Sequence, residues 1–330
     1  MMRPTQKQYR NMQGESTGGS VTETYVVASQ IIYDAFGRPS LQTFQAPIDD
    51  QCGFEYDANF IRDASTGGAY DYVDFDDFTQ TGTSNTRENP VAVRNTSTLG
   101  RYYSSSNNQE ENVAETAYPY VRSTVSQHGV ARSGGPGHVM RMGNGHESMQ
   151  VNMLVQDELN HYIQFRENIV SGISPATSGL KNKALKTISR DSEGQEMVSF
   201  YNLSGNMIAS ALSGDAQPVT RIPGSVGNQS VAATDPEFHY VDIHISADLL
   251  STSWGGATSA TIHIYDMITD DMIYSGSAAS FSGFTQGGFY RIVQIDNLGT
   301  SVEIRYQSNY YDFTYYYYDL GGRLIAEVQP

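Results

Sequence analysis

The sequence predicts a mainly β protein built from β-hairpins, with an inserted antiparallel β-sandwich and one short helical segment. A turn-like pattern of six residues occurs four times. Apolar residues alternate strictly in several other segments, as they do in half-buried strands. The 330 residues include 23 Tyr and 31 Gly, a combination that favours many strands joined by tight turns.

In each copy of the pattern, Asp or Asn is followed three positions later by Gly and then by a long polar residue. The copies read YDAFGR from Tyr33, RDSEGQ from Arg190, YNLSGN from Tyr201 and YDLGGR from Tyr318. Asp or Asn starts a turn through side-chain hydrogen bonds, and Gly supplies the positive φ needed to leave it. We therefore predict hairpin turns with positive φ at the repeat glycines, Gly37, Gly194, Gly205 and Gly322.

The spacing of the two middle copies predicts how they are joined. Asp191 and Asn202 lie eleven residues apart, which is about one strand plus one turn. We therefore expect both turns to connect adjacent strands of one sheet.

These residues resemble the YD repeats of Rhs and teneurin-type proteins, whose motif reads roughly Tyr-Asp-x-x-Gly-Arg-Leu. The match is direct in the first and last copies, at Tyr33, Asp34, Gly37, Arg38, Tyr318, Asp319, Gly322 and Arg323. It is weaker in the middle copies, at Asp191, Gly194, Tyr201, Asn202 and Gly205, because Gln195 and Asn206 replace the Arg. The resemblance, to the Bacteroidota type, implies hairpins that wind in a spiral into a large hollow β-shell.

The resemblance also implies a function. We expect a structural, non-catalytic section of an exported shell used for encapsulation, scaffolding or surface contact, without a cofactor. We expect the protein to be secreted or located on the cell surface. The polar first residues show no secretory signal, so they do not indicate the export route. The alternative is a glycan- or protein-binding module that acts through the inserted β-sandwich.

The resemblance and the last hairpin together predict the partners. The strand from Leu324 to Val328 leaves a β-edge, and such edges recruit another strand. We expect further YD-repeat shell sequence or another protein at this open edge, since shells of the family usually run far longer. An enclosed toxin or a cell-surface glycan is the other expected partner.

Four ranges describe the expected organisation. They are a polar N-terminal segment (1–24), a YD-repeat section with long loops (25–215), an inserted β-sandwich (216–308) and a returning hairpin (309–330). A helix is predicted near 151–168, because Val151, Val155 and Leu159 recur at i+4. Five strands are predicted in the insertion, at 238–245, 261–265, 272–274, 289–295 and 302–306.

Charge and cysteine content narrow the classes of function. The net charge of −16, without a basic patch, argues against nucleic acid and anionic membranes as partners. No apolar stretch approaches the roughly 20 residues of a membrane-spanning helix, so no membrane insertion is expected. Cys52 is the single cysteine, which excludes an intrachain disulfide, and no catalytic partner accompanies it in sequence.

Two clusters have residue types that bind metals. Asp71, Asp74, Asp76 and Asp77 place four carboxylates in seven residues and form a weak calcium candidate. The spacing does not fit an EF-hand, so a solvated strand edge is the preferred interpretation. His138, His146 and Glu147 have the chemistry of zinc ligands but lie among glycines without helical spacing, and we expect a structural loop there.

Aromatic residues give the last candidate site. Trp254 and the run Tyr315–Tyr318 have rings that stack on sugars in carbohydrate-binding sandwiches. Alternate side chains of a strand face opposite ways, so we expect one set of tyrosine rings to be buried and the other exposed.

Overall fold

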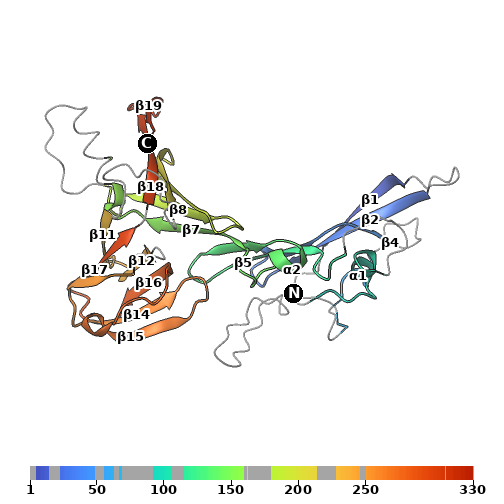
Figure 1. The fold of residues 1–330 in the computed structure, drawn as a ribbon, viewed down its shortest axis with the longest axis horizontal. Coiled ribbons are helices and arrows are strands. Elements are labelled where there is room, and N and C mark those ends of the chain that lie inside the picture. Colours follow the sequence, from blue (N-terminus) through green and yellow to red (C-terminus); the bar gives the residue numbers. More distant parts are fainter. Residues whose placement is uncertain are drawn as a thin grey trace. The chain divides into compact units, whose positions relative to one another are not determined.

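The computed structural model describes residues 5–14, 23–48, 56–62, 67–68, 92–105, 115–159, 162, 180–213, 228–245, 250–308 and 310–329. The protein is mainly β, and its sheets are antiparallel, as the sequence predicts. The chain divides into two compact units (Figure 1). The first comprises Met1–Thr124 and Arg132–Ser148, and the second comprises Val125–Ala131 and Met149–Pro330.

The first unit contains hairpin strands and two short helices. Its elements are β1 (Thr5–Gly14), β2 (Glu23–Tyr33), β3 (Pro39–Thr43), β4 (Ala46–Ile48), α1 (Thr98–Tyr102), β5 (Tyr120–Val125), β6 (Ala131–Gly134) and α2 (Gly137–Met140). The strands follow the order β1-β2-β3-β5-β6, and β4 also pairs with β2. Ile32, Leu41 and Leu99 are among the buried residues that pack α1 against this sheet.

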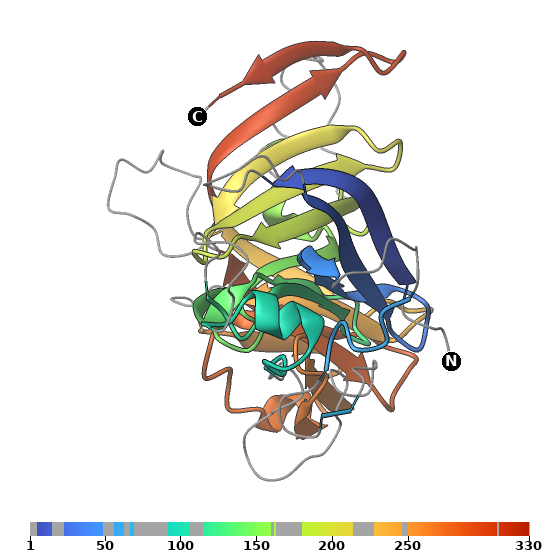
Figure 2. The ribbon, with the colours of Figure 1, turned by 90° about the vertical axis from the view of Figure 1, so that its right-hand side faces the viewer.

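The second unit contains a meander of hairpins. Its strands are β7 (Ser148–Leu154), β8 (Ala184–Arg190), β9 (Glu196–Asn202), β10 (Met207–Ser213), β18 (Tyr310–Tyr318) and β19 (Leu324–Val328), in this spatial order. The strands β7 to β10 and β18 place apolar side chains in one core, where Ile188, Phe200 and Phe313 are buried. Figure 2 shows the yellow strands of the meander and the red β18–β19 hairpin in succession.

The part of the chain that lies between β10 and β18 in sequence forms two smaller sheets. The three-stranded sheet has the order β11-β17-β13, with β11 (Asn228–Ala233), β13 (Ser253–Gly256) and β17 (Val302–Ser308). The four-stranded sheet has the order β12-β16-β14-β15, with β12 (Tyr240–Ile245), β14 (Thr261–Asp266), β15 (Met272–Ser277) and β16 (Gly288–Gln294). Both contribute to one core, which includes Ile304 from the first sheet and Ile262 and Ile292 from the second.

The five strands predicted in this region are all present as β12, β14, β15, β16 and β17. β11 and β13 are not among the strands predicted from the sequence. Alternation is hard to recognise in these strands, because β11 consists of small and polar residues and β13 reads Ser-Trp-Gly-Gly. Their pairing with β17 supplies the regularity that their own sequences lack.

The helix predicted near 151–168 is wrong over its first part. Val151–Leu154 lies in β7, and only a 3₁₀ turn, Asp157–Leu159, follows. From residue 160 onward the range lies outside the described residues, apart from Tyr162. A spacing of four is also two periods of a strand, so Val151 and Val155 face one side of an extended chain as well as one side of a helix. Met153, between them, is also buried, so burial alternates with a period of two residues, as in a strand.

This alternation makes a testable prediction. Met153 is 3% exposed, whereas its neighbour Leu154 is 39% exposed. Met153→Ala should lower the free energy of unfolding by roughly 2–5 kcal/mol, because it leaves a cavity in the core. Leu154→Ala is the matched control and should cost clearly less. Chemical denaturation measures both, and equal losses would contradict the strand assignment.

Candidate functional site

The four repeat turns share one hydrogen-bond pattern. In each, a side-chain oxygen of Asp or Asn accepts the backbone amides two and four residues later, at 2.9–3.0 Å. The backbone N–H of the same Asp or Asn donates to the carbonyl four residues later at 2.9–3.0 Å, and the Gly N–H donates back to its carbonyl at 2.9–3.1 Å. Each turn therefore satisfies the N–H groups of its Asp or Asn and of the residues two, three and four positions later from within its own five residues.

The glycine prediction is confirmed. Gly37, Gly194, Gly205 and Gly322 have φ values of +78°, +86°, +80° and +76°. A Cβ added at Gly194 or Gly205 would meet no atom within 4 Å, so space does not require glycine there. The left-handed backbone conformation requires it.

The Arg that closes the first and last copies adds an ion pair. Arg38 Nε donates to Asp34 Oδ2 at 2.6 Å, and Arg323 Nε donates to Asp319 Oδ2 at 2.8 Å. The pKa of Asp319 is lowered by the backbone amide of Arg323 and then by its side chain. Burial raises the pKa of Asp34, but hydrogen bonds from the Arg38 backbone and side chain outweigh burial and lower it. Gln195 and Asn206 stand at the Arg position of the two middle copies and cannot form this ion pair.

A buried ion pair in the second unit links the hairpin sheet to the 3₁₀ turn that follows β7. Lys186 Nζ on β8 contacts Glu158 Oε1 in the 3₁₀ turn, and both side chains are buried. Glu158 Oε2 accepts the backbone N–H of Gln156 at 2.6 Å, and the hydroxyl of Tyr306 on β17 lies 3.4 Å from Oε1. The charge of Lys186 also lies 5.7 Å from the centre of the Tyr310 ring. Partners on both sides compensate the cost of burying these charges.

A second buried network lies between β9 and β12. His244 Nε2 is 3.2 Å from Glu196 Oε2, and its Nδ1 is 3.2 Å from the Tyr310 hydroxyl. Arg190 Nε donates to Glu196 Oε1 at 2.9 Å. Burial raises the pKa of Glu196, but the charges and hydrogen bonds of His244 and Arg190 outweigh burial and lower it from 4.5 to about 2. The carboxylate is therefore held in its ionised form.

Neither network is predicted from the sequence, although the sequence contains a signal for both. Lys186 lies on the same face of β8 as the buried Ala184 and Ile188. In β9, Glu196 lies on the same face as the buried Val198. A charged residue on the apolar face of a strand predicts a buried partner. The identity of that partner requires the tertiary structure.

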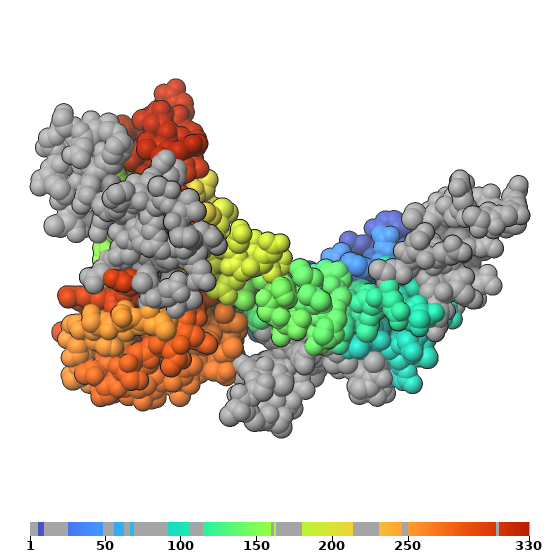
Figure 3. All heavy atoms as spheres, viewed as in Figure 1, coloured from blue at the N-terminus to red at the C-terminus, as the bar shows by residue number. Residues whose placement is uncertain are grey.

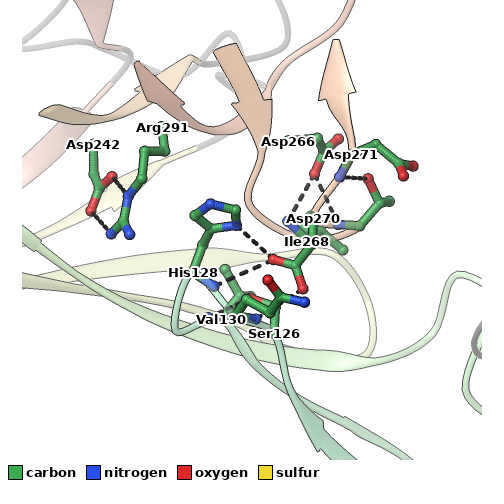
Figure 4. A network of polar contacts seen from close by, with 11 residues as sticks. Ser126, His128, Val130, Asp242, Asp266, Ile268, Asp270, Asp271 and Arg291 are labelled. Atoms are coloured by element: carbon green, nitrogen blue, oxygen red, sulfur yellow. Dashed lines mark hydrogen bonds and ion pairs between the residues drawn. The ribbon is translucent and has the colours of Figure 1, made fainter. Parts of the chain in front are cut away.

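A third polar network surrounds the turn between β14 and β15 (Figure 4). Asp270, which has a φ of +61°, directs its carboxylate at the hairpin tip that contains His128. Its Oδ1 lies 2.6 Å from His128 Nδ1, and its Oδ2 accepts the Gln127 amide at 2.9 Å. Nearby, Arg291 and Asp242 form a two-pronged pair in which both distances are 2.7 Å. Each carboxylate is engaged in fixing a loop or a strand pair.

The predicted structural loop around Gly143 is found. Gly143 and Gly145 have positive φ, and the buried Glu147 accepts the Gly143 N–H and lies 3.4 Å from Arg132 Nη2. His138 and His146 are exposed. Across the described part of the chain, no three His, Cys, Asp or Glu side chains are grouped so that they could hold a metal ion.

Two other predictions lie outside the described residues. They concern the calcium candidate at Asp71, Asp74, Asp76 and Asp77, and Cys52. Neither enters the site described here.

The aromatic candidates differ in exposure. Phe313, Tyr315 and Tyr317 line one face of β18, where Tyr162 stacks on Tyr317 with ring centres 4.9 Å apart. Burial raises the pKa of Tyr315 to about 12. These rings pack in or against the core. The expected exposed set of rings is not found, because Tyr316 and Tyr318 on the same strand are partly buried rather than exposed. Trp254 and Phe281 meet edge to face, with 6.0 Å between their centres, and both are only partly buried.

The strand β19 is the most exposed apolar element of the described structure. Its side chains Leu324 and Ile325 are 51% and 67% exposed, and Leu320 in the preceding turn is fully exposed. After the third repeat turn, by contrast, Ile208 and Ala209 of β10 are buried. In the space-filling view the C-terminal hairpin, in red, projects from the second unit (Figure 3).

Comparison with known proteins gave no match: no family model, curated protein or solved structure is similar to this chain. Within the described ranges, no helix is long and apolar enough to span a membrane.

The turn geometry makes a prediction about glycine. Gly205→Ala should lower the free energy of unfolding by about 1 kcal/mol or more, because alanine resists a φ of +80°. Gly299 also has open space around it and is not among the glycines with positive φ, so Gly299→Ala is the matched control. Thermal or urea denaturation compares the two variants. A neutral effect at Gly205 would show that the turn does not depend on its glycine.

The buried ion pair makes a second prediction. Lys186→Met should lower the free energy of unfolding by roughly 3–5 kcal/mol, because it leaves the Glu158 carboxylate buried without its counter-charge. Adding Glu158→Gln should recover part of that loss, since the amide oxygen can still accept the N–H of Gln156. A double-mutant cycle measures the coupling. Losses that simply add would contradict an interaction between the two charges.

The lowered pKa of Glu196 makes a prediction about acid. A group whose folded pKa is depressed stabilises the fold above its unfolded pKa and loses that contribution as the pH falls. The free energy of unfolding should therefore decrease as the pH falls from about 4.5 to about 2. Glu196→Gln should reduce this slope, whereas Glu193→Gln, in the exposed turn beside it, should keep it. Equal slopes in both variants would rule out Glu196 as the source.

Proposed function

We propose that this chain is a structural, non-catalytic section of a hairpin wall of the Rhs/YD-repeat type, secreted or displayed on the cell surface. The observation that carries the proposal is the turn pattern that four separate hairpins share, down to the individual hydrogen bonds. A repeated, self-sufficient turn is what a wall of successive hairpins needs. Two of these turns join β8, β9 and β10 into adjacent strands, as a continuous wall requires.

The chemistry of the buried charges agrees with a structural role. Lys186, Glu158 and Glu196 each lie against an opposite charge, and each makes a further hydrogen bond or ring contact within the core. A catalytic acid or base needs access to a substrate, and these groups are enclosed by their partners. We propose containment, scaffolding or surface contact as the function, with an enclosed toxin or a cell-surface glycan as the partner.

In this proposal, the strands between β10 and β18 form an inserted β-sandwich. The two small sheets that face one shared core support that interpretation. The insertion leaves and re-enters the meander at neighbouring strands, since β10 pairs with β18. A hairpin wall can therefore carry the insertion without interrupting its own strand order.

The reading frames around the coding region test this proposal. A wall section should be accompanied, in the same or an adjacent frame, by further Asp-x-x-Gly hairpins at spacings of about one strand plus one turn. Frames on both sides that lack such hairpins would contradict the proposal.

A second candidate function rests on Trp254. Its partly buried ring, with Phe281 and Tyr274, forms an aromatic group at the border of the small-sheet core, and such groups bind sugars by stacking. A glycan array probed with the full chain tests this candidate. Binding that is lost in Trp254→Ala and kept in Phe238→Ala, an exposed aromatic on another loop, would support it. An array without binding would exclude glycans as its ligand.

A further inference from the structure

The hairpin sheet has a free edge strand in each unit. Within the described residues, β19 pairs with β18 alone, and β1 pairs with β2 alone. Alternate residues of such strands direct backbone N–H and C=O groups away from the sheet. Both strands also expose apolar side chains, Ile325 on β19 and Tyr9 on β1.

The charges of these two edges are complementary. β1 carries Lys7 and Arg10 and no acidic residue, in a chain with only 20 basic residues against 36 acidic ones. β19 carries Glu327 and no basic residue. Lys7, Tyr9 and Glu327 are all exposed. Opposite charges and apolar side chains across a strand pair stabilise the pairing.

Other edge strands of the described structure lack this complementarity. No charged residue occurs in β4, β11, β13 or β15. β12 carries Asp242, which already forms an ion pair with Arg291. A second β19 would bring Glu327 close to another Glu327, and like charges across strands are destabilising. Among these strands, β1 is the one with a net positive charge.

We propose that β19 of one copy of this chain pairs antiparallel with β1 of a second copy, in the register that sets Glu327 opposite Lys7 and Ile325 opposite Tyr9. The proposal rests on the proposed function, because it extends the hairpin wall from copy to copy. Such an interface joins different surfaces of identical chains, so it generates a ring or an open filament rather than a closed pair.

The expected association is weak. Five paired residues bury much less than the roughly 1,200 Å² of a standard stable interface, so assembly should depend strongly on protein concentration. A covalent readout that captures the contact is therefore the appropriate test.

The experiment places the photo-crosslinking residue p-benzoylphenylalanine at position 325 of the full chain. A mixture of ¹⁵N-labelled and unlabelled copies is irradiated at high concentration, and the crosslinked peptides are identified by mass spectrometry. The proposal predicts mixed-label crosslinks from position 325 to peptides that contain residues 5–14. Mixed-label crosslinks to the β19 or β15 peptide instead, or no mixed-label crosslink, would overturn it.

Charge reversal gives an independent readout in solution. Glu327→Lys should raise the apparent dissociation constant of assembly about threefold to fivefold, measured by sedimentation velocity. Adding Lys7→Glu to the same chain should restore assembly, because it returns opposite charges to the two strands. Assembly that is insensitive to both changes would overturn the pairing.

The two proposals fail in distinguishable ways. If copies do not crosslink and the flanking reading frames still encode further hairpins, the wall continues within one polypeptide, and only the pairing of copies is wrong. If the flanking frames lack hairpins, the proposed function fails whatever the crosslinks show.

Discussion

The contact of Lys186 with Glu158 is the strongest electrostatic constraint on the core of the second unit, because both side chains are buried. It places two full charges in the core, where desolvation costs several kcal/mol per ion unless partners compensate it. Compensation comes from β8, from the 3₁₀ turn and from Tyr306 on β17 at once. Glu158 thus contacts both the hairpin sheet, through Lys186 on β8, and a smaller sheet, through Tyr306 on β17. His244 on β12 and Glu196 on β9 form a second polar contact between the same two parts of the unit.

The repeat turns differ from these networks, because their hydrogen bonds involve no residue that is distant in the sequence. Each turn closes its hydrogen bonds within five residues, so the chemistry of Asp and Gly determines its form directly from the sequence. This is why the turn positions and the sign of φ at Gly37 or Gly322 were predictable. The same locality made β14 and β16 predictable, since their alternation is a property of neighbouring residues.

The errors and omissions arose where local sequence is ambiguous or where contacts are long-range. The spacing of Val151, Val155 and Leu159 fits both a helix and a strand, and pairing with β8 decides between them. Lys186 and Glu158 are 28 residues apart, His128 and Asp270 are 142 apart, and Tyr306 and Glu158 are 148 apart. Periodicity can indicate that a buried charge needs a partner, but it cannot identify one at such separations. The Rhs/YD-repeat resemblance and the function it implies stay predictions.

The central claim is that the second unit consists of hairpins whose core contains a buried charge pair. Hydrogen–deuterium exchange of the full chain, measured by mass spectrometry, tests this claim most directly. The account predicts slow exchange in peptides from β8 to β10 and fast exchange at low protein concentration in peptides from β19. It also predicts that Lys186→Met accelerates exchange in β17 together with β8, because Glu158 contacts both Lys186 and Tyr306. Fast exchange throughout β8 to β10, or a variant whose effect stays within β8, would contradict the account.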